Sequence, residues 1–167
     1  GETATRKHPA RVIATMAAIC EEAEQSIDIR QVDHRLENYF ERIDEGIAMA
    51  TIYAANHMGV QAIAALTESG STPLWMSRVR SGIPIYALAS SDETARRVSL
   101  YRGVYPVKLH EPLKDPKMAN RQAVELLIEE GIVEAGDLVI VTKGDLMGTK
   151  GGTNQMKILR VGEHHNG

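Results

Sequence analysis

The sequence predicts a three-layer α/β/α fold built around a mostly parallel five-stranded sheet. Short apolar runs alternate with segments whose apolar residues recur at helical spacing, which is the pattern of a layered α/β domain. The runs that begin at residues 61, 83 and 136 are almost continuously apolar, as strands covered on both faces must be. A chain of 167 residues is long enough for about one such domain with its own core.

The first part of the chain contains two predicted helices and a connector. Residues 9–27 form an amphipathic pattern, and Pro9 suits the first turn of a helix. Residues 28–42 are rich in charge and weakly periodic, so we interpret them as a connector. A second helix is predicted over residues 43–58. Its apolar side is expected to consist of Ile43, Ile47, Ala50, Ala54 and Met58.

The remainder of the chain supplies the sheet. Strands are expected at residues 61–67, 83–89, 105–109, 136–143 and 154–162. Helices are expected from about residue 72 to Arg80, from near Asp92, and over 116–131, where Gly131 ends the helix. No helix separates the last two strands, so the fifth strand is expected to run antiparallel to the fourth. We therefore divide the chain into residues 1–27, the connector 28–42 and an α/β domain over 43–167.

Composition excludes several classes of function. The 19 basic and 22 acidic residues give a net charge of −3, so no basic field indicates nucleic acid or a membrane surface as partner. No apolar run approaches the ~20 residues of a membrane span. The single cysteine, Cys20, cannot form an internal disulfide, which favours a reducing, cytoplasmic location. The chain begins without methionine or a signal peptide, and we expect it to be part of a longer protein.

The first candidate site is a hydroxyl-rich loop (residues 67–72) between a predicted strand and a predicted helix. Its candidate ligands are Thr67, Ser69, Gly70, Ser71 and Thr72. Hydroxyl groups and the unpaired backbone N–H groups of residues 69–72 are suited to bind an oxyanion. Helix capping selects the same residue types, so composition alone leaves an anion site and an ordinary capping turn equally open.

The second candidate is a glycine-rich loop (residues 143–153) between the last two strands. Its candidate residues are Lys143, Gly144, Asp145, Lys150, Gly151, Gly152 and Thr153. A nucleotide-cleaving P-loop requires a hydroxyl residue directly after the lysine and a helix beyond it. Here Gly151 follows Lys150 and a strand comes next, so that interpretation is rejected. A hairpin connection and a ligand-covering loop both remain open.

The two loops are expected to lie at the same edge of the sheet. Each follows the carboxyl end of a predicted strand, where ligands collect in parallel-sheet folds. They could therefore close on one ligand. The chain offers no nucleophile with a base and an orienting partner, and the adjacent His164 and His165 do not define a metal site. We expect no catalytic residue, metal site or cofactor in this chain.

Four motifs in this order resemble the C-terminal part of pyruvate kinases. "GETATRKHP" resembles the segment that closes the catalytic barrel, and "LTESGSTP" resembles the effector phosphate loop. "LYRGVYPV" is similar to a family signature, and "GDLVIVTKGDLMGTKGGTNQMKILRVG" is similar to the last two strands with the effector loop between them. The resemblance covers essentially the whole chain and is closest to the bacterial enzymes that are activated by monophosphates.

The resemblance implies the following organisation. The whole enzyme would carry a catalytic (β/α)₈ barrel, transfer phosphate from phosphoenolpyruvate to ADP in glycolysis, and use Mg²⁺ and K⁺. This chain would be the effector-binding domain, preceded by a helix (residues 9–27) left over from the barrel, and alone it would be inactive. The hydroxyl-rich loop would hold the effector's phosphate, and residues 144–153 would cover its sugar. The helix over 43–58 and the strand over 154–161 would lie at the subunit contacts of a homotetramer.

Two departures from the family pattern qualify these implications. Arg6, Lys7 and His8 replace the family's G-x-Y before proline, which weakens the likeness of the barrel-end loop. Members activated by fructose bisphosphate carry a tryptophan and an arginine in the last loop, where this chain has Asp145, Leu146 and Met147. An aspartate there would repel a second phosphate. We therefore expect a hexose monophosphate, a pentose monophosphate or AMP as effector.

Two other classes of function remain as alternatives. The chain could be a free-standing α/β module that senses phosphorylated metabolites or drives oligomerisation, with no kinase attached. An independent enzyme is disfavoured because no acid–base pair or nucleophile was found.

Overall fold

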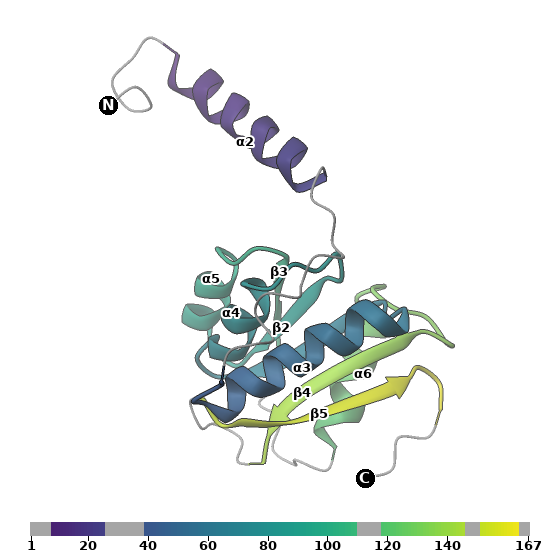
Figure 1. Ribbon diagram of the computed structural model, residues 1–167. Coiled ribbons are helices and arrows are strands. Elements are labelled where there is room, and N and C mark those ends of the chain that lie inside the picture. The colour runs from purple at the N-terminus through teal and green to yellow at the C-terminus, as the bar shows by residue number, and fades with distance from the viewer. Residues whose placement is uncertain (1–7, 26–38, 110–117, 146–150, 164–167) are drawn as a thin grey trace. The chain divides into compact units, whose positions relative to one another are not determined.

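The computed structural model describes residues 8–25, 39–109, 118–145 and 151–163 (Figure 1). These residues belong to two compact units, Gly1–His34 and Arg35–Gly167. The predicted positions at Lys150, His164 and His165 lie outside the described residues. None of the helices in the described part of the chain combines the length and the apolar character needed to cross a membrane.

The first unit contains α2 (Pro9–Gln25), which begins at the proline that the sequence indicated. Its apolar side chains Ile13, Met16 and Ile19 are exposed, and so is Cys20. An amphipathic helix in a protein gains most of its stability by burying such a stripe against a partner. The described residues of this unit do not bury the stripe of α2.

The second unit contains the predicted five-stranded sheet. Its strands are β1 (Ala62–Thr67), β2 (Ile85–Ala89), β3 (Val104–Lys108), β4 (Leu138–Gly144) and β5 (Thr153–Arg160), arranged in the order β3-β2-β1-β4-β5. β1 pairs in parallel with both β2 and β4, and β2 pairs in parallel with β3. β4 and β5 are antiparallel. The predicted α/β class, strand number and direction of the last strand are confirmed.

Helices cover both faces of the sheet (Figure 1). They are α3 (Ile43–Met58), α4 (Ser71–Ser77), α5 (Asp92–Val98) and α6 (Ala119–Glu129). α5 starts where predicted because the hydroxyl of its N-cap Ser91 accepts the backbone N–H of Thr94 at 3.2 Å. The chain moves outward from β1 to β3 and then returns across the sheet through α6 to β4. This return puts β4 beside β1 and brings the ends of these two strands together.

The core has a layer on each face of the sheet. On one face, α6 packs Ala123 and Leu127 against Ala64 and Val141 in a continuous apolar cluster. Side chains alternate along a strand, so Ile63 and Ile140 point to the opposite face. α3 and α4 lie against that face.

The orientation of α3 differs from the prediction. The predicted apolar side includes Ile43, which is 71% exposed, and Ala50, which is also exposed. The buried side consists instead of Asp44, Ala48, Met49, Thr51, Ile52 and Ala55. α3 is apolar around most of its circumference, so spacing alone could not decide which side packs on the sheet.

Replacement of a central sheet residue tests this core. Ile140→Ala should lower the free energy of unfolding by about 2–5 kcal/mol, because Ile140 is fully buried in β4 and its loss leaves a cavity. Leu100→Ala is the control, since Leu100 is 86% exposed and its loss should change stability by less than about 0.5 kcal/mol. Urea unfolding of both variants measures the difference. Equal effects would contradict the assignment of Ile140 to the core.

Candidate functional site

The hydroxyl-rich loop joins the carboxyl end of β1 to α4. Gly70 adopts φ +78°, and a Cβ built on it would lie 2.8 Å from Cγ1 of Val98 in α5. The loop therefore requires glycine both for its conformation and for the close approach of α5. The backbone N–H of Gly70 donates to the hydroxyl oxygen of Thr67 at 2.8 Å, so this N–H is not one of the unpaired donors that the sequence suggested.

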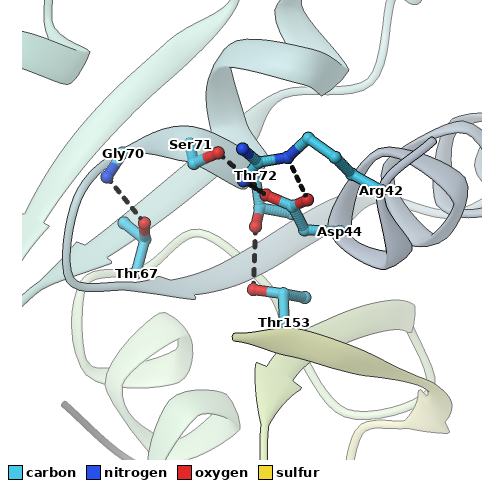
Figure 2. Close-up of polar contacts among 7 residues, drawn as sticks. All are labelled: Arg42, Asp44, Thr67, Gly70, Ser71, Thr72 and Thr153. Atoms are coloured by element: carbon cyan, nitrogen blue, oxygen red, sulfur yellow. Dashed lines mark hydrogen bonds and ion pairs between the residues drawn. The ribbon is translucent and has the colours of Figure 1, made fainter. Parts of the chain in front are cut away.

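A hydrogen bond between two buried threonines connects the two loops (Figure 2). The Thr72 hydroxyl donates to the Thr153 hydroxyl at 2.7 Å, although 81 residues separate them. Thr153 begins β5 and pairs with Gly144 at the end of β4. The pairing of β4 with β1 therefore brings the start of α4 against the start of β5.

The base of the glycine-rich loop is tightly closed. A Cβ on Gly144 would lie 2.5 Å from the carbonyl oxygen of Gly152, so the two backbone segments can approach only with glycine at 144. The exposed carboxylate of Asp145 accepts from the side-chain amide of Asn154 at 2.7 Å and from that of Gln155. Asp145 thus holds the two ends of the loop together.

Lys143 does not join the other candidate residues. It is buried near the end of β4, where it shares a sheet face with Val141 through strand alternation. Val141 belongs to the cluster under α6, whereas Thr67 points to the face covered by α4. The structure therefore places the Lys143 side chain on the far side of the sheet from Thr67.

A charged pair that the sequence analysis did not select lies beside the hydroxyl-rich loop (Figure 2). The carboxylate of Asp44, in the first turn of α3, is 1% exposed. Arg42 donates to it through Nε and Nη2, both at 2.9 Å, and the Ser71 hydroxyl donates to Oδ2 at 2.8 Å. The signal in the sequence that could have identified Asp44 was an acidic residue at the start of an otherwise apolar helix. Acidic residues are common in the first turn of any helix, so this signal did not single out Asp44.

The glycine-rich loop also reaches this pair. Gly151 adopts φ +68°, and a Cβ on it would lie 2.9 Å from Nη2 of Arg42 and 3.8 Å from Oδ2 of Asp44. Asp44 and Arg42 therefore lie between Ser71 of one loop and Gly151 of the other. The connector, α3 and both candidate loops meet at this carboxylate.

The surroundings of Asp44 shift its acidity. Burial alone would raise the pKa of its carboxyl group. Hydrogen bonds from Arg42 and Ser71, the positive charge of Arg42 and the backbone N–H of Glu45 outweigh burial and hold the pKa below its usual value. Asp44 is therefore a buried anion at neutral pH whose charge is stabilised by the residues of the candidate site.

This arrangement is suited to bind an oxyanion rather than to perform chemistry. The Ser71 hydroxyl and the Arg42 guanidinium group donate to the same carboxylate, and a guanidinium group with a hydroxyl is a donor set suited to phosphate. Among the residues that the structure describes, no group of three or more His, Cys, Asp or Glu residues could hold a metal ion.

The acidity of Asp44 predicts a pH-dependent contribution to stability. The folded-state pKa is lowered, so the contribution is complete above the unfolded pKa of about 3.9 and disappears as pH falls through the folded-state value. Asp44→Asn should cost about 1–3 kcal/mol at pH 7, and this cost should shrink as pH falls below about 4. Urea unfolding between pH 7 and pH 3 measures it. Glu125→Gln, at an exposed position on α6, should show a cost below about 1 kcal/mol at every pH, and an Asp44→Asn cost independent of pH would refute the assignment.

Comparison with known proteins identifies the family. Residues 45–159 match the family model described as "Pyruvate kinase, alpha/beta domain". The chain is 45% identical to "Pyruvate kinase II" of Salmonella typhimurium over 161 residues, which are 96% of this chain and 33% of that protein. It is 44% identical to "Pyruvate kinase" of Buchnera aphidicola subsp. Baizongia pistaciae and 42% identical to "Pyruvate kinase" of Haemophilus influenzae, with the same coverage. The chain thus spans about a third of the length of these curated relatives, and it belongs to the pyruvate kinase family, of which it carries the C-terminal α/β domain.

Proposed function

We propose that this chain is the regulatory domain of an enzyme that transfers phosphate from phosphoenolpyruvate to ADP, giving pyruvate and ATP. The observation that carries the regulatory part is the Thr72–Thr153 hydrogen bond, which joins a hydroxyl-rich loop to a glycine-rich loop at the carboxyl edge of the sheet. Ligands of α/β folds bind at this edge. The names of the relatives support the activity of the whole enzyme.

The proposed ligand is a phosphorylated effector. Its phosphate would bind in the hydroxyl-rich loop, at Thr67, Ser69, Gly70, Ser71 and Thr72. Residues 144–153 would cover the sugar, which the close approach of Gly144 and Gly152 at the base of this loop supports. Binding of the effector would favour one arrangement of the subunits and so change the affinity of the catalytic part for its substrate.

The charge of Asp145 supports a monophosphate as effector. Its exposed carboxylate lies at the base of the glycine-rich loop, where Asn154 and Gln155 hold it. A second phosphate that reached this loop would meet a negative charge in a fixed position. A hexose monophosphate, a pentose monophosphate or AMP avoids this repulsion, and fructose 1,6-bisphosphate does not.

The proposed subunit contacts involve α3 and β5. β5 forms an edge of the sheet, and α3 lies against it on one face (Figure 1). Ile43, Tyr53 and Met58 of α3 are large apolar side chains that remain exposed. An unpaired strand edge beside exposed apolar side chains favours association with a second copy, and the whole enzyme is proposed to be a homotetramer.

Catalysis is proposed to reside in a (β/α)₈ barrel outside this chain. Mg²⁺ and K⁺ would act there, held by residues of the barrel. The exposed apolar stripe of α2, with Ile13, Met16 and Ile19, supports its proposed role as a helix that packs on the barrel. The 167 residues alone are expected to be inactive.

Calorimetric titration of this chain tests the effector site. Glucose 6-phosphate, ribose 5-phosphate or AMP should bind saturably, and fructose 1,6-bisphosphate should bind at least about tenfold more weakly because of Asp145. Unphosphorylated glucose is the control for binding through the sugar alone. No saturable binding of any phosphorylated compound, with the fold intact, would refute the effector site.

A substitution in the hydroxyl-rich loop localises the binding. Ser71→Asp should weaken binding by at least about 100-fold, because it removes a hydroxyl group and adds a negative charge at the proposed phosphate position. Ser99→Asp makes the same change at an exposed position at the end of α5 and should leave affinity unchanged. Urea unfolding establishes that each variant is folded. Unchanged affinity in folded Ser71→Asp would place the site elsewhere.

The proposed association through α3 is tested separately. Tyr53→Glu places a charge on the exposed side of α3 and should weaken self-association by at least about tenfold in sedimentation equilibrium. Tyr105→Glu, at a half-exposed position on the opposite edge strand β3, is the control. If only the control weakens association, β3 rather than α3 forms the contact.

The alternative function is a free-standing module that senses phosphorylated metabolites or drives oligomerisation. The compactness of the second unit, Arg35–Gly167, is the observation in its favour. The reading frame upstream of residue 1 discriminates between the two. A frame that continues into a barrel, with conversion of phosphoenolpyruvate and ADP by the encoded protein, supports the kinase. A stop codon directly upstream supports the free-standing module.

A further inference from the structure

We infer that Arg42 binds the phosphate of the effector and that Asp44 is an internal anion which occupies the donors of the site until the effector replaces it. The inference rests on the proposed effector function. It assigns to the site two residues outside both candidate loops, and it makes binding an exchange of one anion for another.

The geometry of Asp44 shows which donors are occupied (Figure 2). Its carboxylate accepts two N–H groups from Arg42 and the hydroxyl of Ser71. A phosphate monoester offers the same acceptors, because two of its oxygens match the fork of a guanidinium group and a third accepts a hydroxyl. Asp44 therefore presents to Arg42 and Ser71 the chemistry that the effector would bring.

The charges around the hydroxyl-rich loop favour an exchange. Arg97 donates to the carbonyl oxygen of Ser69 at 3.2 Å but is paired with Glu93 at 2.7 Å. Glu68, within the loop, accepts the hydroxyl of Ser90 at 2.5 Å and adds a further negative charge. A phosphate dianion that entered while Arg42 remained on Asp44 would add to the negative charges of Asp44 and Glu68. Transfer of Arg42 to the phosphate supplies the positive charge that this site needs.

Arg42 is placed where it can make the transfer, and Asp44 keeps part of its stabilisation when Arg42 leaves. The Arg42 side chain is 53% exposed, whereas that of Asp44 is 1% exposed. After Arg42 leaves, Asp44 keeps the backbone N–H of Glu45 and its favourable position in the first turn of a 16-residue helix. The rearrangement would change the surroundings of Gly151 and of the start of α3. A Cβ built on Gly151 would lie 2.9 Å from Nη2 of Arg42.

Calorimetry with glucose 6-phosphate at constant ionic strength tests the exchange. Asp44→Asn should bind about tenfold more tightly than the unsubstituted chain, because the carboxamide carries no charge to compete. Arg42→Gln should bind about tenfold more weakly, and Arg42→Lys should lie between, since lysine keeps the charge but loses the fork. Arg121→Gln and Glu125→Gln make the same charge changes in an exposed pair on α6, across the sheet, and should leave affinity unchanged.

The double variant separates direct binding from neutralisation. If Arg42 contacts the phosphate, Arg42→Gln must still weaken binding about tenfold in the Asp44→Asn background. If Arg42 only neutralises Asp44, that loss disappears and the inference is overturned. Arg42 is half-exposed, so its single variants keep the inference testable even if Asp44→Asn does not fold.

The remaining outcomes distinguish this inference from the proposed function. Binding by the unsubstituted chain with unchanged affinity in Arg42→Gln overturns the inference and leaves the effector site intact. Binding by Asp44→Asn alone refutes the effector site of the unsubstituted chain and overturns the exchange with it, because no effector then displaces Asp44. No binding by the unsubstituted chain, by Asp44→Asn or by any other folded variant overturns both.

Discussion

Parallel pairing of β1 with both β2 and β4 is the constraint on which the rest of the domain depends. Because parallel strands end at the same edge, the loop after β1 and the loop after β4 must emerge side by side. The Thr72–Thr153 hydrogen bond is a consequence of this arrangement, since it joins residues 81 positions apart. β5 then runs back antiparallel to β4, and its first residue, Thr153, pairs with Gly144 at this edge.

A buried carboxylate adds an electrostatic constraint to this edge. Asp44 is held by Arg42 and Ser71, so the start of α3 is tied to the start of α4. A buried charge is tolerated only when it is paired and hydrogen-bonded, and here the residues that stabilise it are those best suited to bind an anion. Stability and ligand binding are thereby linked through the same donors. The exchange inferred above follows from this shared use of Arg42 and Ser71.

Glycine has different physical roles at the two loops. Gly70 adopts a left-handed conformation and also lies against Val98, so a side chain there would be strained and would clash. Gly144 needs glycine because the backbone of Gly152 passes directly over it. The composition of both loops therefore reflects close packing of the backbone as well as any ligand. This is why a glycine-rich pattern alone could not distinguish a tight connection from a binding loop.

The fold class, the order of elements and the position of both loops could be predicted from the sequence, because apolar runs, helix starts and turn residues are local signals. The sequence did not determine which side of α3 is buried, since apolar residues surround most of that helix and only the sheet beneath it selects Asp44, Ala48 and Ile52. From the sequence, Arg42 was assigned to the connector and Lys143 to the glycine-rich loop. Tertiary structure brings Arg42 and Ser71 to the carboxylate of Asp44 and places Gly151 beside Arg42. It also turns Lys143 to the opposite face, because strand alternation and charge pairing take effect only when distant segments pack together.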